Sequence, residues 1–209
     1  MSREPRPSAP ALGALVGIAF LLWAATFAWP VGSFWLKISL AAGFLAAVSL
    51  RLRPRPLARL LPGRGDLLAG AAGAALLYAV FWAGREVSLA VFDFAGGQIE
   101  GIYRRGDGTP AWVIAGLLLL VTGPAEEIFW RGTLQEALME RFGRLRGWAA
   151  AGALYAAVHA ASGNFMLVGA AAVAGAFWGG WYAWGGRLPP VIVSHALWSS
   201  VVFTVLPLR

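Results

Sequence analysis

Apolar residues occur in long runs along most of the chain, and charged residues gather in short stretches between the runs. An α-helix needs about 20 apolar residues to cross a bilayer, so runs of this kind are typical of transmembrane segments. The pattern predicts an all-α membrane protein, a bundle of about seven transmembrane helices. We expect the helices over residues 11–29, 34–50, 67–84 with an extension to 92, 111–142, 148–161, 165–184 and 191–206.

Residues 1–10 form a short polar stretch rich in proline, and we expect them to be a disordered tail on the cytoplasmic side. The apolar run that follows is longer than the roughly 7–15-residue apolar core of a signal peptide, and it ends in aromatic residues and Pro30 rather than in small residues. It is therefore expected to stay as the first helix. We find no internal repeat and no second domain, so residues 11–209 are expected to form a single transmembrane domain, with a motif-bearing core at about 110–205.

The run over residues 111–142 is longer than the others. At about 1.5 Å per residue it would extend about 48 Å, whereas the apolar core of a bilayer is about 30 Å thick. Proline removes a helical hydrogen bond, so a break is expected near Gly123-Pro124. Before this run, residues 93–110 are expected to form a glycine-rich loop.

Lysine and arginine are distributed unevenly between the two predicted sides of the membrane. An excess of basic residues marks the cytoplasmic side, so the N-terminus and the arginine-rich loop after residue 50 are expected in the cytoplasm. The basic residues of that side are at positions 3, 6, 51, 53, 55, 59, 64, 141, 144, 146 and 187, against 104, 105 and 209 on the other side.

Composition narrows the function classes. Of the 209 residues, 59% are hydrophobic and only 13% are charged, about half the charged share of a soluble protein. A net charge of +7 would suggest a nucleic-acid partner for a soluble protein, but here the membrane topology accounts for it, and no nucleic acid is expected. The chain has no cysteine, which excludes disulfides, thiolate metal ligands and a cysteine nucleophile.

Three charged residues fall within one predicted transmembrane helix: Glu126, Glu127 and Arg131. Ionisable residues inside a bilayer are costly and usually face the bundle interior, which makes them candidates for function, although a self-neutralising cluster is the alternative. Glu127 and Arg131 are four residues apart, so they can pair on one helical face. Glu126 is rotated by about 100° and lacks such a partner, so it is the candidate general base.

Both histidines of the chain, His159 and His195, also lie in predicted transmembrane helices. Tyr155 precedes His159 by four residues, and Ser199 follows His195 by four residues. Each pair shares a helical face, so each can project two polar groups into the bundle interior.

These residues resemble three motifs of the CAAX-protease and bacteriocin-processing (CPBP, or Abi) family, which includes the Rce1-type prenyl-protein endopeptidases. The motifs, in their order along the chain, are Glu126-Glu127-x-x-x-Arg131, Tyr155-x-x-x-His159 and His195-x-x-x-Ser199.

The resemblance implies a role for each residue. Glu126 and His159 would activate a water molecule, and His195 and Ser199 would stabilise the oxyanion. The residues in support would be Glu127, Arg131 and Tyr155. Two positions depart from the family, because Tyr155 replaces the usual phenylalanine and Ser199 replaces the usual asparagine.

We therefore expect an intramembrane endopeptidase that depends on glutamate, uses no cofactor and cleaves a membrane-anchored protein or peptide. In a zinc-dependent alternative, the metal ligands would be Glu126, His159 and His195, although the sequence lacks His-Glu-x-x-His. A non-enzymatic immunity or scaffold protein of the same family and a proton-coupled transporter are two further alternatives. The expected location is the lipid bilayer, as a multi-pass protein of the bacterial plasma membrane with a cytoplasmic N-terminus.

Overall fold

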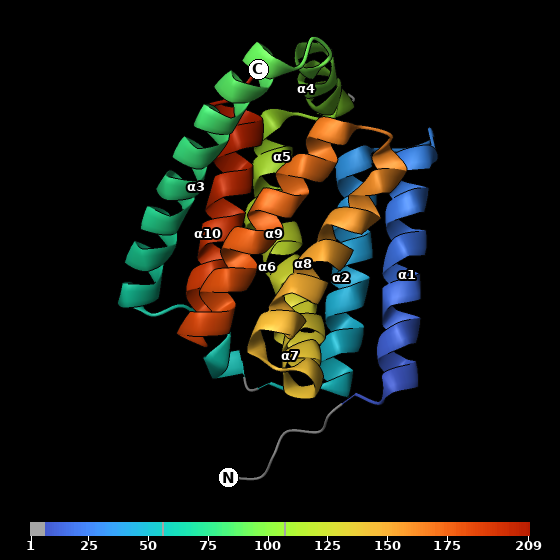
Figure 1. The fold of residues 1–209 in the computed structure, drawn as a ribbon, viewed down its shortest axis with the longest axis vertical. Coiled ribbons are helices and arrows are strands. Elements are labelled where there is room, and N and C mark those ends of the chain that lie inside the picture. Colours follow the sequence, from blue (N-terminus) through green and yellow to red (C-terminus); the bar gives the residue numbers. More distant parts are fainter. Residues whose placement is uncertain (1–6, 56, 107) are drawn as a thin grey trace.

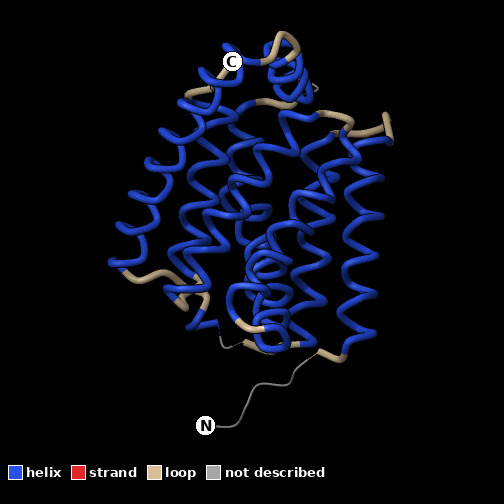
Figure 2. The backbone as a smooth tube through the Cα atoms, in the orientation of Figure 1, coloured by secondary structure: helices blue, strands red, loops and turns tan. Residues whose placement is uncertain are grey.

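The computed structural model describes residues 7–55, 57–106 and 108–209, and within them every regular element is a helix (Figures 1 and 2). Most of the predicted disordered tail, residues 1–6, lies outside the described residues. The α-helices are α1 Ala9–Ala28, α2 Phe34–Leu52, α3 Arg64–Val91, α4 Ala95–Tyr103, α5 Ala111–Leu117, α6 Gly123–Phe129, α7 Glu136–Phe142, α8 Arg144–Val158, α9 Phe165–Gly185 and α10 Pro189–Ser200.

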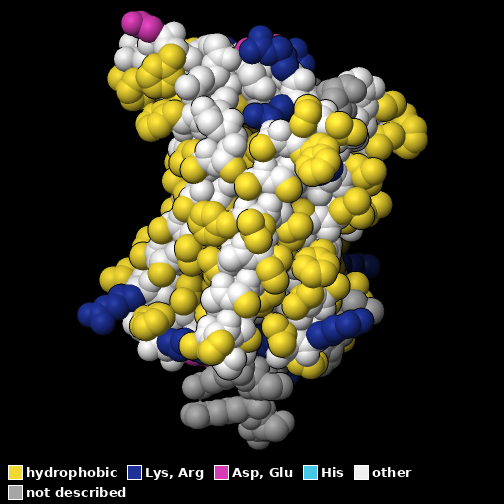
Figure 3. Space-filling view, turned by 90° about the vertical axis from the view of Figure 1, so that its right-hand side faces the viewer, with side chains coloured by type: hydrophobic (Ala, Val, Ile, Leu, Met, Phe, Trp, Pro, Cys, Tyr) yellow, Lys and Arg dark blue, Asp and Glu magenta, His cyan; other side chains and the backbone are white. Residues whose placement is uncertain are grey.

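The helices identify the chain as an integral membrane protein, and the all-α prediction is confirmed. Within the described residues, five helices are long and apolar enough to cross a membrane, and the helix over Pro189–Val205 is apolar but shorter. Figure 3 shows hydrophobic side chains over the middle of one face, with most Lys and Arg side chains near its two ends. The predicted number of seven transmembrane helices stays a prediction.

The predicted break at Gly123-Pro124 is wrong. Residues Ala111–Phe142 form one continuous helix of 32 residues. A π-helical segment, Leu118–Thr122, comes immediately before Gly123, and Pro124 lies in the first turn of α6. The wider π turn shifts the hydrogen-bond pattern just before the proline, and this accommodates the missing N–H without a break. A second π segment, Trp130–Gln135, separates α6 from α7.

The segment 93–110, predicted to be a loop, contains α4 and a 3₁₀ turn at Arg104–Gly106. Tertiary contacts with the start of α9 hold this glycine-rich segment in place. The Gln98 carbonyl accepts a hydrogen bond from Asn164 Nδ2 at 2.8 Å, and Gln98 Oε1 accepts one from the Met166 N–H at 3.0 Å. Such contacts override weak local helix propensity, and they are not visible in the local sequence pattern.

The first helix begins two residues earlier than the predicted start. The Ser8 hydroxyl caps α1 by accepting a hydrogen bond from the Ala11 N–H at 3.3 Å. Pro10 lies in the first helical turn, where its missing N–H needs no partner.

The central helix α6 packs against α2 on one side and α10 on the other (Figure 1). Farther out, α1 lies against α2, α3 lies against α10, and α8 packs against α9. Gly123 allows α6 and α10 to approach closely, because a Cβ atom at this position would lie 2.8 Å from the Cα atom of Ala196. This close approach brings the predicted motif on α6 next to the one on α10.

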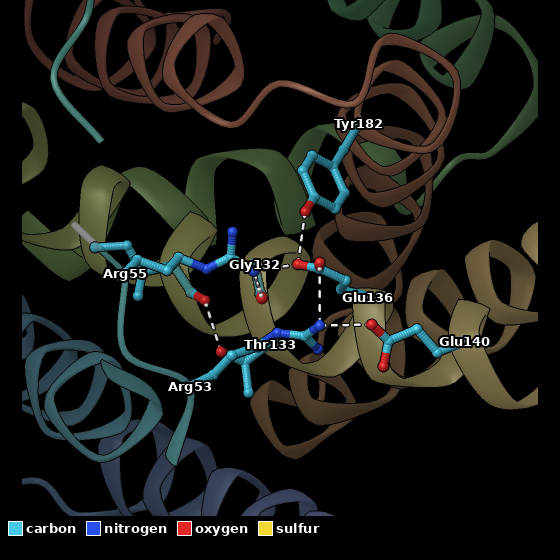
Figure 4. A network of polar contacts seen from close by, with 8 residues as sticks. Arg53, Arg55, Gly132, Thr133, Glu136, Glu140 and Tyr182 are labelled. Carbon is cyan, nitrogen blue, oxygen red and sulfur yellow. Dashed lines mark hydrogen bonds and ion pairs between the residues drawn. The ribbon is translucent and has the colours of Figure 1, made fainter. Parts of the chain in front are cut away.

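A polar network joins the residues that follow α2 to α7 and α9 (Figure 4). It lies at the end of the bundle where α1 begins (Figure 1). Arg53 contacts Glu136 at 3.2 Å and Glu140 at 2.5 Å, and Arg55 pairs with Glu136 and donates to the Gly132 carbonyl at 2.6 Å. The Tyr182 hydroxyl donates to Glu136 Oε2 at 2.8 Å. Because several charges share these contacts, the network fixes the arginine-rich loop to the helix that carries the predicted motifs.

Candidate active site

A cavity of about 450 Å³ opens within the bundle and brings together the four residues predicted to be catalytic. Glu126 from α6, His159 from the 3₁₀ turn after α8, and His195 and Ser199 from α10 all line it. Tyr155 from α8 also contributes to the wall, and most of the remaining lining is apolar. Glu127 and Arg131 lie behind the wall, buried in the protein.

Glu126 is 6% exposed and faces the cavity. The Tyr155 hydroxyl donates a hydrogen bond to Glu126 Oε2 at 3.0 Å. Within the described part of the chain, this is the only hydrogen bond that the carboxylate forms. One oxygen is therefore fixed, while the other is available to a molecule in the cavity.

Glu127 and Arg131 form the expected pair, with Arg131 Nη1 at 2.8 Å from Glu127 Oε1. Both side chains are buried, with exposed fractions of 0% and 2%. The same Glu127 oxygen lies 2.6 Å from His195 Nδ1, a contact that the sequence interpretation missed. Glu127 thus orients the imidazole, so that Nε2 is the nitrogen left for the cavity.

His159 has a partner at each ring nitrogen. Its Nδ1 lies 2.7 Å from the Tyr155 carbonyl, and its Nε2 lies 3.4 Å from Trp23 Nε1. An indole N–H can only donate, so Nε2 is the acceptor and Nδ1 carries the proton that is donated to the carbonyl. In this arrangement the ring is neutral, with the tautomer defined by its two partners.

Two tryptophans that the sequence interpretation did not single out hold the histidines. Trp23, on α1, is fully buried and contacts His159. The Trp178 ring on α9 stacks on His195, with centroids 3.9 Å apart and an interplanar angle of 15°. Trp178 Nε1 also donates to Ser194 Oγ at 3.1 Å. Nothing in the local sequence distinguishes these two from tryptophans of a membrane-interface belt.

Ser199 lies one helical turn beyond His195 and lines the cavity. Its side chain is buried, and its hydroxyl has no hydrogen-bond partner in the described ranges. It can therefore donate one hydrogen bond to a bound molecule.

The described residues contain no group of three or more His, Cys, Asp and Glu side chains that could hold a metal ion. Glu126, His159 and His195 share the cavity, but each is engaged with a different neighbour: Tyr155, Trp23 and Glu127, respectively.

Residues 108–201, which carry all three motifs, match the family described as Type II CAAX prenyl endopeptidase Rce1-like. Over this stretch the chain is similar to the Rce1-like family. No curated protein and no solved structure matches the chain. The description of this family names a prenyl endopeptidase, an enzyme that cleaves peptide bonds. Helices α1 to α4 lie outside the matched stretch, so Trp23 contacts His159 from a part of the chain that the family match does not cover.

Proposed function

We propose that the protein is a glutamate-dependent intramembrane endopeptidase that hydrolyses a peptide bond of a membrane-anchored protein or peptide. The observation that carries the proposal is the cavity wall, where two histidines, a serine and a glutamate face one mostly apolar space. Hydrolysis in a membrane needs these elements together: a base for water, donors for a negative oxygen, and walls that exclude other solvent.

In the proposed reaction, Glu126 uses its free oxygen to take a proton from a water molecule in the cavity. Tyr155 holds the other oxygen, which sets the direction of the carboxylate. The hydroxide attacks the substrate carbonyl, and the proton on Glu126 then passes to the departing amine. In this step the water replaces Trp23 as the hydrogen-bond donor to His159 Nε2.

His195 and Ser199 are proposed to donate hydrogen bonds to the oxyanion. In this role the Nδ1 of His195 stays on Glu127, and an Nε2–H is directed to the oxygen. A well-placed oxyanion donor contributes about 10²–10³-fold to kcat. The serine hydroxyl supplies a second donor from the next turn of α10.

Substitutions at Ser199 and His195 test this function against the zinc-dependent alternative. Ser199→Ala is expected to lower kcat about tenfold or more with little change in KM, because an oxyanion contact strengthens only in the transition state. Ser199→Asn keeps a donor and is expected to retain activity. The measurement is cleavage of a membrane-anchored peptide by purified variants, with the metal content of each sample determined in parallel.

Glutamate-dependent hydrolysis predicts that chelation leaves the wild type active and that no metal copurifies in stoichiometric amount. Stoichiometric zinc that is lost in His195→Ala, with activity abolished by chelator, would instead assign His195 as a metal ligand. If the wild type cleaves none of the membrane-anchored peptides tested, the proposed peptidase function is rejected.

The proposed topology has the N-terminus and the network of Arg53 and Arg55 in the cytoplasm. It is supported by the excess of arginine at that end of the bundle. A reporter fused after Pro62 is expected to read cytoplasmic, and one fused after Thr109 is expected to read external. The reverse pattern would invert the membrane orientation proposed for the active site. A bacterial plasma membrane is the proposed location.

A further inference from the structure

Two basic side chains line the cavity in addition to the catalytic residues. Arg85 from α3 and Arg105 from the 3₁₀ turn after α4 both line it. Among the described residues that form the lining, Glu126 is the only acid, and it belongs to the catalytic wall. The lining of the cavity therefore includes one carboxylate and two guanidinium groups.

The two arginines differ in how their charge is balanced. Arg85 pairs with Glu86 at 2.5 Å on the same helix. The Arg105 guanidinium lies over two rings, 5.0 Å from the Phe27 centroid and 5.7 Å from the Phe34 centroid. In the described part of the chain it forms no hydrogen bond or ion pair. Its face is thus covered by aromatic rings, while its N–H donors have no acceptor among the described residues.

Arg105 is also partly withdrawn from water. Burial lowers the pKa of Arg105, because a charged group loses hydration when the protein surrounds it. A partly desolvated cation that no described residue neutralises favours the binding of an anion in the same space.

Arg105 is within reach of the catalytic wall. The Phe27 ring that supports Arg105 is itself 6.1 Å from the His159 ring. These two contacts place the guanidinium at most about 11 Å from the imidazole. An extended peptide advances about 3.3 Å per residue, so about three to four residues bridge this separation.

We propose that Arg105 forms a carboxylate-binding subsite that fixes the substrate peptide a few residues from the cleaved bond. This inference rests on the proposed peptidase function. A guanidinium and a carboxylate can form a planar, bidentate pair with two parallel hydrogen bonds. A peptide offers only two sources of a carboxylate. One is its C-terminal carboxylate, and the other is an Asp or Glu side chain.

The test uses the full-length protein in liposomes and an N-acylated probe peptide of eight apolar residues. Three forms of the probe are compared: a free C-terminus, a C-terminal amide, and an amide with one glutamate near that end. Binding is measured by tryptophan fluorescence and cleavage by mass spectrometry, for the wild type, Arg105→Gln and Arg105→Lys. The matched control is Arg104→Gln, since Arg104 is the exposed neighbour and does not line the cavity.

The wild type is expected to bind a carboxylate-bearing probe about 10- to 100-fold more tightly than the amide, the range for a charge-assisted hydrogen bond. Arg105→Gln removes this preference, Arg105→Lys retains part of it, and Arg104→Gln leaves it unchanged. The form that gains affinity identifies the source of the carboxylate.

Equal binding of all three probes by the wild type, or an unchanged preference in Arg105→Gln, overturns the subsite. Cleavage of the probes without a preference for a carboxylate would reject the subsite, while the proposed peptidase function would still hold. A preference that depends on Arg105, without cleavage of any probe, would support the subsite and reject the peptidase.

Discussion

Glu126→Gln is expected to lower kcat by about 10²–10⁴-fold, the contribution of a positioned general base. Glutamine has the same shape as glutamate, and its carbonyl oxygen can still accept the Tyr155 hydroxyl hydrogen bond at 3.0 Å. It cannot take a proton from water. The expected result is therefore a folded protein that binds substrate and does not turn it over. The measurement is kcat for a membrane-anchored peptide, together with the thermal unfolding midpoint in the same detergent.

A matched glutamate on the same continuous helix serves as the control. Glu140 lies outside the cavity and pairs with Arg53 at 2.5 Å. Glu140→Gln makes the same chemical change and is expected to leave kcat unchanged. Full activity in Glu126→Gln would show that another group is the base. Equal loss in both variants would point to damage to the helix instead.

Local periodicity was enough to predict the parts of this structure that depend on neighbours in sequence. Apolar runs predicted the long helices, and the four-residue spacing predicted the contact of Glu127 with Arg131, because residues at this spacing share a helical face. Pro124 shows the limit of such reasoning. Its effect depends on the π turn before it, and that turn lies in contact with α10, which is distant in sequence.

The contacts that orient the two histidines could not be predicted in this way. His195 meets Glu127 because Gly123 lets two helices approach, and the two residues are 68 positions apart. Trp23 is 136 positions from His159 and lies outside the matched motifs. A single sequence does not show which residues far apart along the chain are close in space. These partners are therefore visible only once α1, α6 and α10 are packed together.

The largest effect on stability is expected for Glu127→Gln. Glu127 is fully buried, and its Oε1 contacts both Arg131 and His195. Breaking a buried ion pair by removing one partner costs about 3–5 kcal/mol, because the remaining charge stays buried without compensation. Unfolding of the purified variant by denaturant in detergent measures this loss. The control is Glu86→Gln, since Glu86 belongs to an ion pair at the protein surface, which contributes little.

A double variant separates the structural role of Glu127 from its effect on the reaction. In Glu127→Gln with Arg131→Met the unpaired charge is gone, and methionine keeps apolar bulk beside the Tyr155 ring, which lies 4.7 Å from the guanidinium. Most of the lost stability is therefore expected to return. The value of kcat is expected to stay low, because His195 still lacks the carboxylate that orients its imidazole. Recovery of both stability and kcat would mean that Glu127 acts on the fold alone, and failure to recover stability would mean that the buried Arg131 charge is not the cause of the loss.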